Sequence, residues 1–289
     1  MLMNRRQLLT TLTAGPVAVQ LEAQSAPGLR FRAGLVAYSY RKELAEKTMS
    51  YQDLIRRVAD WGLDGLDCTV YWFPDNSPEY LASLRNTAFR NSVEIYNAGL
   101  RVQLAQPTPE LQLAEFANIR KWVDVAERLG ASHVRVFGGN VPKGATERQA
   151  IAWAAEVLKR GAEYAGTKGI MLGVENDYGL TVEPGPTAAI VKQAASPWAG
   201  INADTGNLRT DGYAQLRTLL PYVSSVHLKS QVSTPDGKKE PADWTRLLEI
   251  LGGSGYRGYV GLEYEGTQAD AEIPRLAAEL RTVVRKLSL

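Results

Sequence analysis

Short apolar runs alternate with longer segments of helical periodicity about eight times along this chain, from about residue 29 to the C-terminus. Strands that alternate with helices in this way build βα units around a parallel sheet. A regular eightfold count favours a closed (β/α)₈ barrel, the TIM-barrel fold, over an open doubly wound sheet. The predicted strands span residues 33–40, 65–70, 92–98, 133–138, 170–176, 198–204, 223–229 and 258–264.

The residues between these runs carry helix start and stop signals. Ser50 precedes an amphipathic run that ends at Gly62, and Thr146 with Gln149 has the spacing of a capping box. No linker, charge block or low-complexity tract divides the 289 residues, and this length suits one barrel. We therefore expect a single barrel domain over residues 30–289.

Composition excludes several classes of function. The formal charge is only +2 and the basic residues are scattered, which gives no electrostatic footprint for nucleic acid. Cys68 is the only cysteine, so an intramolecular disulfide and a thiolate metal cluster are excluded, and we expect this thiol to pack inside the barrel. No stretch of the barrel sequence reaches the roughly 20 apolar residues of a membrane span.

The first 25 residues have the pattern of an export signal. Arg5 and Arg6 precede a mildly apolar, uncharged stretch, and Ala23 and Ser25 place small residues at the −3 and −1 positions of a cleavage site. A twin arginine before a modest apolar region is typical of the twin-arginine (Tat) export route. We therefore expect residues 1–25 to be a Tat signal peptide and the mature protein to be soluble in the periplasm.

The residues with the clearest chemistry stand at the ends of the last four predicted strands. Active sites of TIM barrels lie at the C-terminal ends of the strands. Four neighbouring strands would each deliver one potential metal ligand at the same level, which predicts a site built from Glu175, Asp204, His227 and Glu263.

The charges of this set predict a bound cation. Buried carboxylates are costly unless they are compensated, and Lys229 is the only basic residue that we identify near these strand ends. One lysine cannot neutralise three carboxylates, whereas one divalent ion can. Three oxygen donors and one nitrogen favour Mn²⁺ first, with Mg²⁺, Co²⁺ or Zn²⁺ as alternatives. An internal network of ion pairs is the competing interpretation.

The same residues resemble a known family. Four signatures of the xylose-isomerase-like sugar phosphate isomerase/epimerase family, ENH, DxGH, HxKD and GYxGxxxxE, have counterparts in the same order at residues 175–177, 204–207, 227–230 and 258–265. The resemblance extends over residues 33–285. It implies that Glu175, Asp204, His227 and Glu263 bind one divalent metal ion.

The resemblance also implies roles in catalysis and substrate binding. Glu175 and Glu263 are expected to transfer protons on opposite sides of a bound sugar, and Lys229 to hold a substrate oxygen. The chain departs from the family beside the ligands, because Asp177 and Asn207 stand where histidines are usual. Ser230 likewise replaces an aspartate. Asp177 and Asn207 are therefore candidate substrate contacts, and the identity of the sugar stays open.

Other residues near the predicted strand ends carry weaker hypotheses. Tyr38 and Trp72 can form a flat apolar wall for a sugar, or they can simply pack over the barrel. Asp67 and Glu265 can support the ligands or form ion pairs on the rim. His133 opens its strand, about 16 Å below the site at the strand rise, so we expect it to be structural.

The leading hypothesis is a metal-dependent isomerase or epimerase that acts on a non-phosphorylated keto sugar or sugar acid through an enediolate. A dehydratase or 3-keto-glycoside lyase shares the first step, which is proton removal next to a carbonyl. A DNA-repair nuclease of the related branch needs a zinc cluster rich in histidine, and this chain has two histidines. A non-catalytic sugar-binding barrel is the alternative of another class, and assembly into homo-oligomers is left open.

The export signal makes a prediction that can be tested in the native host. The protein recovered from the periplasm should begin near residue 26, and replacing Arg5 and Arg6 by Lys should hold it in the cytoplasm. N-terminal sequencing of fractionated cells measures both. A cytoplasmic protein that keeps residues 1–25 would refute the prediction.

Overall fold

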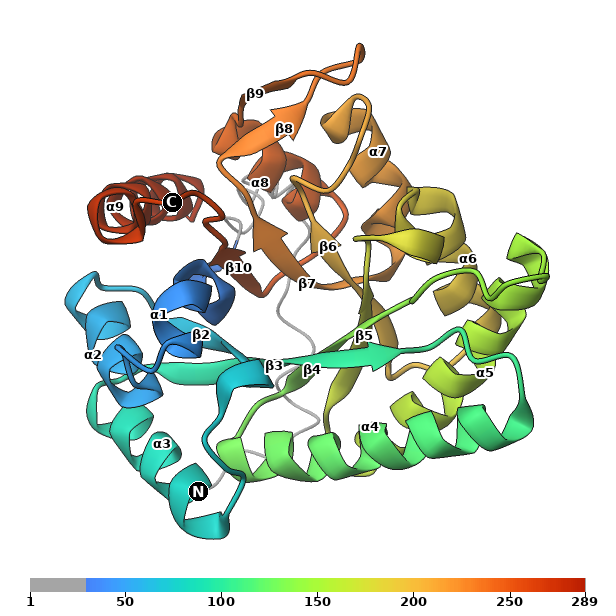
Figure 1. Ribbon diagram of the computed structural model, residues 1–289. Coiled ribbons are helices and arrows are strands. Elements are labelled where there is room, and N and C mark those ends of the chain that lie inside the picture. The colour runs from blue at the N-terminus through green and yellow to red at the C-terminus, as the bar shows by residue number, and fades with distance from the viewer. Residues whose placement is uncertain (1–29, 289) are drawn as a thin grey trace, which may run out of the picture.

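The computed structural model describes residues 30–288, and the predicted signal peptide lies outside them. Eight parallel strands close into a barrel with helices around it (Figure 1), in the order β1-β2-β3-β4-β5-β6-β7-β10 and back to β1. This confirms the predicted TIM barrel. The barrel strands are β1 (Arg32–Val36), β2 (Gly65–Thr69), β3 (Glu94–Gln103), β4 (His133–Phe137), β5 (Met171–Glu175), β6 (Ala199–Asp204), β7 (Val223–Leu228) and β10 (Tyr259–Leu262).

Helices connect these strands and cover the outside of the barrel. The α-helices are α1 (Arg41–Ala45), α2 (Tyr51–Asp60), α3 (Pro78–Arg90), α4 (Pro109–Leu129), α5 (Glu147–Gly166), α6 (Pro184–Ala194), α7 (Gly212–Leu219), α8 (Trp244–Gly253) and α9 (Ala269–Leu287). Short 3₁₀ helices span Ala37–Tyr40, Val70–Trp72, Gly179–Thr181 and Leu220–Tyr222. Within the described residues, no helix is both long and apolar enough to cross a membrane.

Local sequence signals account for where the helices begin and end. Ser50 and Thr146 both form complete capping boxes, in which the cap side chain accepts from a backbone N–H three residues later. Gly130 ends α4 in the left-handed conformation, with φ of 81°, which glycine adopts without steric cost. The predicted capping box at Thr146 is therefore confirmed.

Two strand limits differ from the predicted ones by several residues, and one hairpin was not predicted. The end of the first predicted strand forms the 3₁₀ helix Ala37–Tyr40, and β3 continues five residues further than expected, to Gln103. An additional antiparallel hairpin, β8 (Gln231–Ser233) and β9 (Lys239–Pro241), follows β7. Its strands have three residues each, too short to give a periodic sequence signal.

Glycines make room for one large side chain inside the barrel. Tyr96 of β3 is buried and stacks on Tyr259 with ring centroids 4.0 Å apart. A Cβ atom added to Gly261 would lie 2.3 Å from the Tyr96 hydroxyl, and one on Gly34 would lie 2.7 Å from its ring. Both contacts are far closer than van der Waals separation, so these strands need glycine where they face Tyr96.

Strand register brings the predicted site residues to one level. Asp204 at the end of β6 is paired with His227 of β7, and Glu175 at the end of β5 is paired with Asn202 of β6. Glu263 follows the last residue of β10, and its backbone N–H donates to the Leu228 carbonyl of β7. The closed parallel sheet therefore delivers all four side chains to the same end of the barrel.

Candidate metal centre

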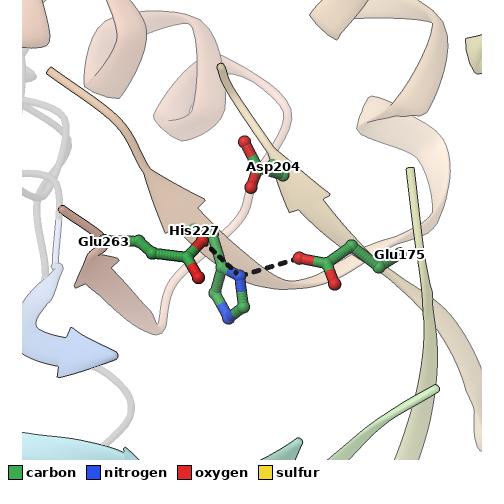
Figure 2. A group of neighbouring side chains, drawn as sticks. All are labelled: Glu175, Asp204, His227 and Glu263. Carbon is green, nitrogen blue, oxygen red and sulfur yellow. Dashed lines mark ion pairs between the residues drawn. The ribbon is translucent and has the colours of Figure 1, made fainter. Parts of the chain in front are cut away.

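The four predicted ligands converge at the C-terminal end of the barrel. Each offers one donor atom, and these atoms all lie within 4.8 Å of one another in a buried cluster of Glu175, Asp204, His227 and Glu263. Figure 2 shows the side chains pointing toward a common centre from β5, β6, β7 and the end of β10. The structure therefore brings the four predicted residues together.

His227 turns its Nδ1 atom toward this centre. Nδ1 lies 2.8 Å from Glu175 Oε1 and 3.3 Å from Glu263 Oε2. It has no well-directed hydrogen bond to any of residues 30–288, although it is fully buried. An unsatisfied nitrogen surrounded by three carboxylates fits a divalent cation, for which one nitrogen and three oxygen donors are a suitable set.

Hydrogen bonds fix the orientation of the carboxylates. Asp204 Oδ1 accepts from the backbone N–H groups of Gly206 and Asn207 at 2.8 and 3.1 Å, which leaves Oδ2 facing the centre. Glu175 Oε1 accepts from the Asn202 side-chain amide at 3.1 Å. Asn176 holds the Asp204 backbone from both sides, because it donates to the carbonyl at 2.9 Å and accepts from the N–H at 2.8 Å.

Two buried cations compensate the carboxylates, where the sequence analysis identified one. Lys229 Nζ lies 3.3 Å from Asp204 Oδ2 and 3.0 Å from Glu263 Oε2. Arg135 of β4 is also buried, and its Nε lies 3.1 Å from Glu175 Oε2. Lys229 is therefore not the only basic residue near these strand ends, and that prediction was wrong. Because the two cations compensate part of the negative charge, the convergence of the donor atoms is what indicates a metal ion.

Arg135 could have been recognised from its place in the sequence. It sits between Val134 and Val136 in a buried strand, where a charged residue needs a partner. Its Nη1 donates to the Tyr71 hydroxyl at 2.7 Å and to the Leu100 carbonyl at 3.1 Å. The partners lie on other elements of the barrel, so the sequence gives no indication of which carboxylate it binds.

The environment shifts the pKa values of the ligands in different directions. Burial raises the pKa of Asp204 to about 7, against the opposing effect of Lys229. Burial disfavours the charged form of His227, but Glu175 and Glu263 outweigh it and raise the pKa well above its ordinary value. Burial also acts on Glu263, yet Lys229 and His227 prevail and hold its pKa well below the usual range.

A cavity of about 360 Å³ opens above this cluster. Four of the predicted substrate residues line it: Tyr38, Asp177, Asn207 and Lys229. Trp72 is not among the lining residues and packs behind Tyr38, with ring centroids 5.9 Å apart. The lining residues that the sequence analysis did not assign to the site include Arg101, Gln103, Arg135, Phe137 and Tyr178.

Two of the three departures from the family pattern contact each other in this cavity. Asn207 donates from its side-chain amide to Asp177 Oδ1 at 3.3 Å and to the Asn176 carbonyl at 3.2 Å. Burial and the neighbouring Glu175 raise the pKa of Asp177 to about 6. Its carboxyl group therefore takes up a proton more readily than an exposed aspartate.

The remaining residues considered from the sequence lie beside or below the ligand cluster. Glu265 forms an ion pair with Lys229 at 3.0 Å, and Asp67 contacts the far side of the His227 ring. Cys68 is fully buried, as expected, and burial raises the pKa of its thiol. His133 lies inside the barrel below the cluster, hydrogen-bonded to Asn97 and Ser224.

The chain belongs to the family of xylose isomerase-like TIM barrels, because residues 55–287 match the model of that family. Among curated proteins, it is similar to a putative hydroxypyruvate isomerase of Mus musculus, with 27% identity over 235 residues that cover 68% of this chain and 77% of the relative. The family and this relative support an enzyme.

Solved structures show the same fold at low sequence identity. A D-psicose 3-epimerase with D-fructose superposes with a TM-score of 0.72 at 16% identity, covering 89% of this chain and 99% of that one. A probable 3-DHS dehydratase of Bacillus anthracis gives 0.68 at 14% identity, covering 87% and 98%. One scaffold therefore carries both epimerases and dehydratases.

The pKa shifts predict how metal binding depends on pH. Metal ions displace protons from their ligands, so affinity for Co²⁺ should rise from about pH 6 to 8 as Asp204 loses its proton, and should continue to rise at higher pH as His227 loses its own. The metal-free protein should lose stability over the same change, because a folded-state pKa raised above the unfolded value stabilises only at lower pH. Chelator competition and thermal unfolding measure both, and a pH-independent affinity contradicts this prediction.

Proposed function

We propose that the protein is a divalent-metal-dependent isomerase or epimerase that moves a proton next to the carbonyl of a non-phosphorylated keto sugar or sugar acid. The observation that carries this proposal is the convergence of the four donor atoms within 4.8 Å at the base of a cavity. Membership of the xylose isomerase-like family supports it.

The residues that would hold the ion are Glu175, Asp204, His227 and Glu263, with Mn²⁺ as the preferred ion and Mg²⁺, Co²⁺ or Zn²⁺ as alternatives. When bound, the ion would supply Lewis-acid polarisation of the substrate carbonyl and stabilise the negative charge of an enediolate.

The two glutamates are suited to proton transfer. Glu175 is paired with Arg135, and Glu263 with Lys229, which together with His227 holds the pKa of Glu263 well below its usual range. One glutamate, as the carboxylate, removes the proton from the carbon next to the carbonyl. The other, which must begin the step as the carboxylic acid, returns a proton to the neighbouring carbon or to the opposite face. Lys229 is close enough to the cavity to bind a substrate oxygen.

A dehydratase or 3-keto-glycoside lyase is the second candidate, and Asp177 favours it. Elimination needs an acid that protonates the leaving oxygen after the first proton is removed. Asp177 lines the cavity, and its pKa of about 6 leaves part of the population protonated near neutral pH. An unsaturated product, detected by its ultraviolet absorbance, distinguishes elimination from isomerisation.

Arg101 favours an acidic substrate over a neutral one. Arg135 and Lys229 are engaged with carboxylates, whereas the structure of residues 30–288 gives Arg101 no ion pair. Its guanidinium stacks on the Tyr71 ring, 4.3 Å from the centroid, and lines the cavity. Stacking holds the planar group in place and leaves its N–H edge for a carboxylate.

Export by the Tat route, which we also propose, would bring the enzyme to non-phosphorylated sugar acids.

The metal site can be tested by elemental analysis of the purified protein. We expect about one equivalent of a divalent metal ion, lost in Glu175→Gln, Asp204→Asn, His227→Ala and Glu263→Gln. Glu265→Gln is the matched control, because Glu265 contacts Lys229 outside the ligand set. In an active preparation, Glu263→Gln should lower kcat by roughly 10²- to 10⁴-fold. A wild type that takes up no ion in excess metal overturns the proposal and favours a binding barrel.

The preference for an acid can be tested with hydroxypyruvate and its neutral analogue dihydroxyacetone. Arg101→Gln should lower kcat/KM for hydroxypyruvate by roughly 10- to 100-fold, which is the value of a hydrogen bond to a charged group, and leave dihydroxyacetone unchanged. Arg101→Lys keeps the positive charge but lacks the paired N–H donors of arginine. Its kcat/KM for hydroxypyruvate should lie between that of wild type and that of Arg101→Gln. Equal losses of kcat/KM for both compounds would mean that Arg101 does not bind the carboxylate of the substrate.

A further inference from the structure

The two ring nitrogens of His227 face different partners. Nδ1 faces the ligand cluster, whereas Nε2 lies 2.8 Å from Asp67 Oδ2, on β2 at the opposite side of the barrel interior. Both residues are fully buried. A carboxylate beside Nε2 accepts a hydrogen bond from Nε2–H, so that once a metal ion displaces the Nδ1 proton, His227 presents the lone pair of Nδ1 to the ion.

Asp67 is the first member of a longer hydrogen-bonded chain. Its Oδ2 also accepts from the Asn97 side-chain amide of β3 at 2.7 Å. Asn97 Oδ1 lies 2.9 Å from His133 Nδ1, and His133 Nε2 lies 2.9 Å from Ser224 Oγ. The chain runs from His227 through β2, β3 and β4, and returns to β7 at Ser224. We refer to Asp67, Asn97, His133 and Ser224 as the buried relay.

The chemistry of its members gives every bond in the buried relay one direction. Asn97 turns its NH₂ group toward Asp67 Oδ2 and its carbonyl oxygen toward His133 Nδ1. His133 must therefore carry its proton on Nδ1. Burial lowers the pKa of His133 to about 3, so this imidazole is neutral and Nε2 can only accept. The Ser224 hydroxyl, which lies 2.9 Å from Nε2 and 3.2 Å from the Ile201 carbonyl, then donates to Nε2.

We propose that Asp67, Asn97 and His133 are positioning residues for the metal centre, which hold His227 in the tautomer and orientation that present Nδ1 to the ion. This inference rests on the metal site of the proposed function and is independent of the reaction. Metal-bound histidines usually donate their second N–H to an oxygen acceptor, and loss of that acceptor typically weakens metal binding by roughly 10- to 100-fold.

Two substitutions at Asp67 can separate the effect of its negative charge from the effect of its hydrogen bonds. Its Oδ1 has no hydrogen-bond partner among the described residues, whereas Oδ2 accepts from both His227 and Asn97. In Asp67→Asn, the amide oxygen can occupy the Oδ2 position and its NH₂ group the unpartnered one. The hydrogen bonds then remain and only the negative charge is lost. Asp67→Ala removes both.

The first test reads the tautomers directly. The chain has two histidines, so long-range ¹H–¹⁵N correlation spectra of the full-length Zn²⁺-loaded protein resolve each ring. We expect His133 as the Nδ1–H tautomer and His227 protonated on Nε2 with Nδ1 bound to Zn²⁺. His133 as the Nε2–H tautomer or as an imidazolium, or Zn²⁺ on Nε2 of His227, would overturn the proposal.

Two neighbouring serines provide a matched pair for the same spectra. Ser224 bonds to His133, whereas the hydroxyl of the adjacent Ser225 is buried without a partner in the described chain. Because Asn97 keeps the proton on Nδ1, Ser224→Ala should leave His133 in the Nδ1–H tautomer and shift its Nε2 resonance, and Ser225→Ala should change neither. Loss of the Nδ1–H tautomer in Ser224→Ala would show that Asn97 and Asp67 do not fix it.

The second test measures Co²⁺ affinity by chelator competition. Affinity should fall by roughly 10-fold in Asp67→Asn and roughly 100-fold in Asp67→Ala, and by roughly 3- to 10-fold in His133→Ala, which acts through two intervening residues. Thermal unfolding of the metal-free variants gives a separate measure of stability. Variants that unfold at lower temperature but bind Co²⁺ as tightly as wild type would show that the relay is only structural.

These outcomes separate the inference from the proposed function. A wild type that binds Co²⁺ without isomerase activity refutes the proposed reaction. The role of the buried relay is still supported in that case if Co²⁺ affinity falls in the variants as expected. A wild type that binds Co²⁺ and is active, with variants of unchanged affinity, refutes the relay alone. Failure of the wild type to bind any ion refutes both.

Discussion

Three carboxylates are buried together at one end of this barrel, and their compensation determines much of what surrounds them. Isolated charges in a protein interior cost several kcal/mol each. Arg135 of β4 supplies part of the compensation, and His227 and Lys229, within and just after β7, supply the rest. Because the compensating groups contact specific oxygen atoms, they also orient the carboxylates, so one set of contacts both stabilises the cluster and shapes it.

Sequence periodicity and strand-end residues were sufficient to predict the barrel and its four central side chains. They were sufficient because the strands are buried apolar runs of ordinary length and the site lies where such folds place it. Arg135 and the hairpin β8–β9 were missed for different reasons. A charge within a strand does not reveal its partner, and three-residue strands have no measurable period.

The buried relay illustrates a further limit of sequence reasoning. Asp67 and His227 are 160 positions apart, and His133 was expected to be structural because it begins its strand below the site. The distance argument was correct, since His133 does not reach the cluster. It gave no information about Asn97 and Asp67, which join the two histidines across the barrel interior. Such links depend on strand order and register, which only the closed sheet defines.

The order of the donors along the chain has a consequence for folding. Glu175, Asp204 and His227 come from β5, β6 and β7, whereas Glu263 follows β10, the last barrel strand. A partly synthesised chain that lacks β10 therefore has an incomplete set of donors. Asp67, the hydrogen-bond partner of His227 Nε2, is 160 positions away, and contacts between residues this far apart form late, because loop closure must precede them. The donors and their support would therefore be complete only once the barrel has closed, and retention of the ion would mark chains that have finished folding.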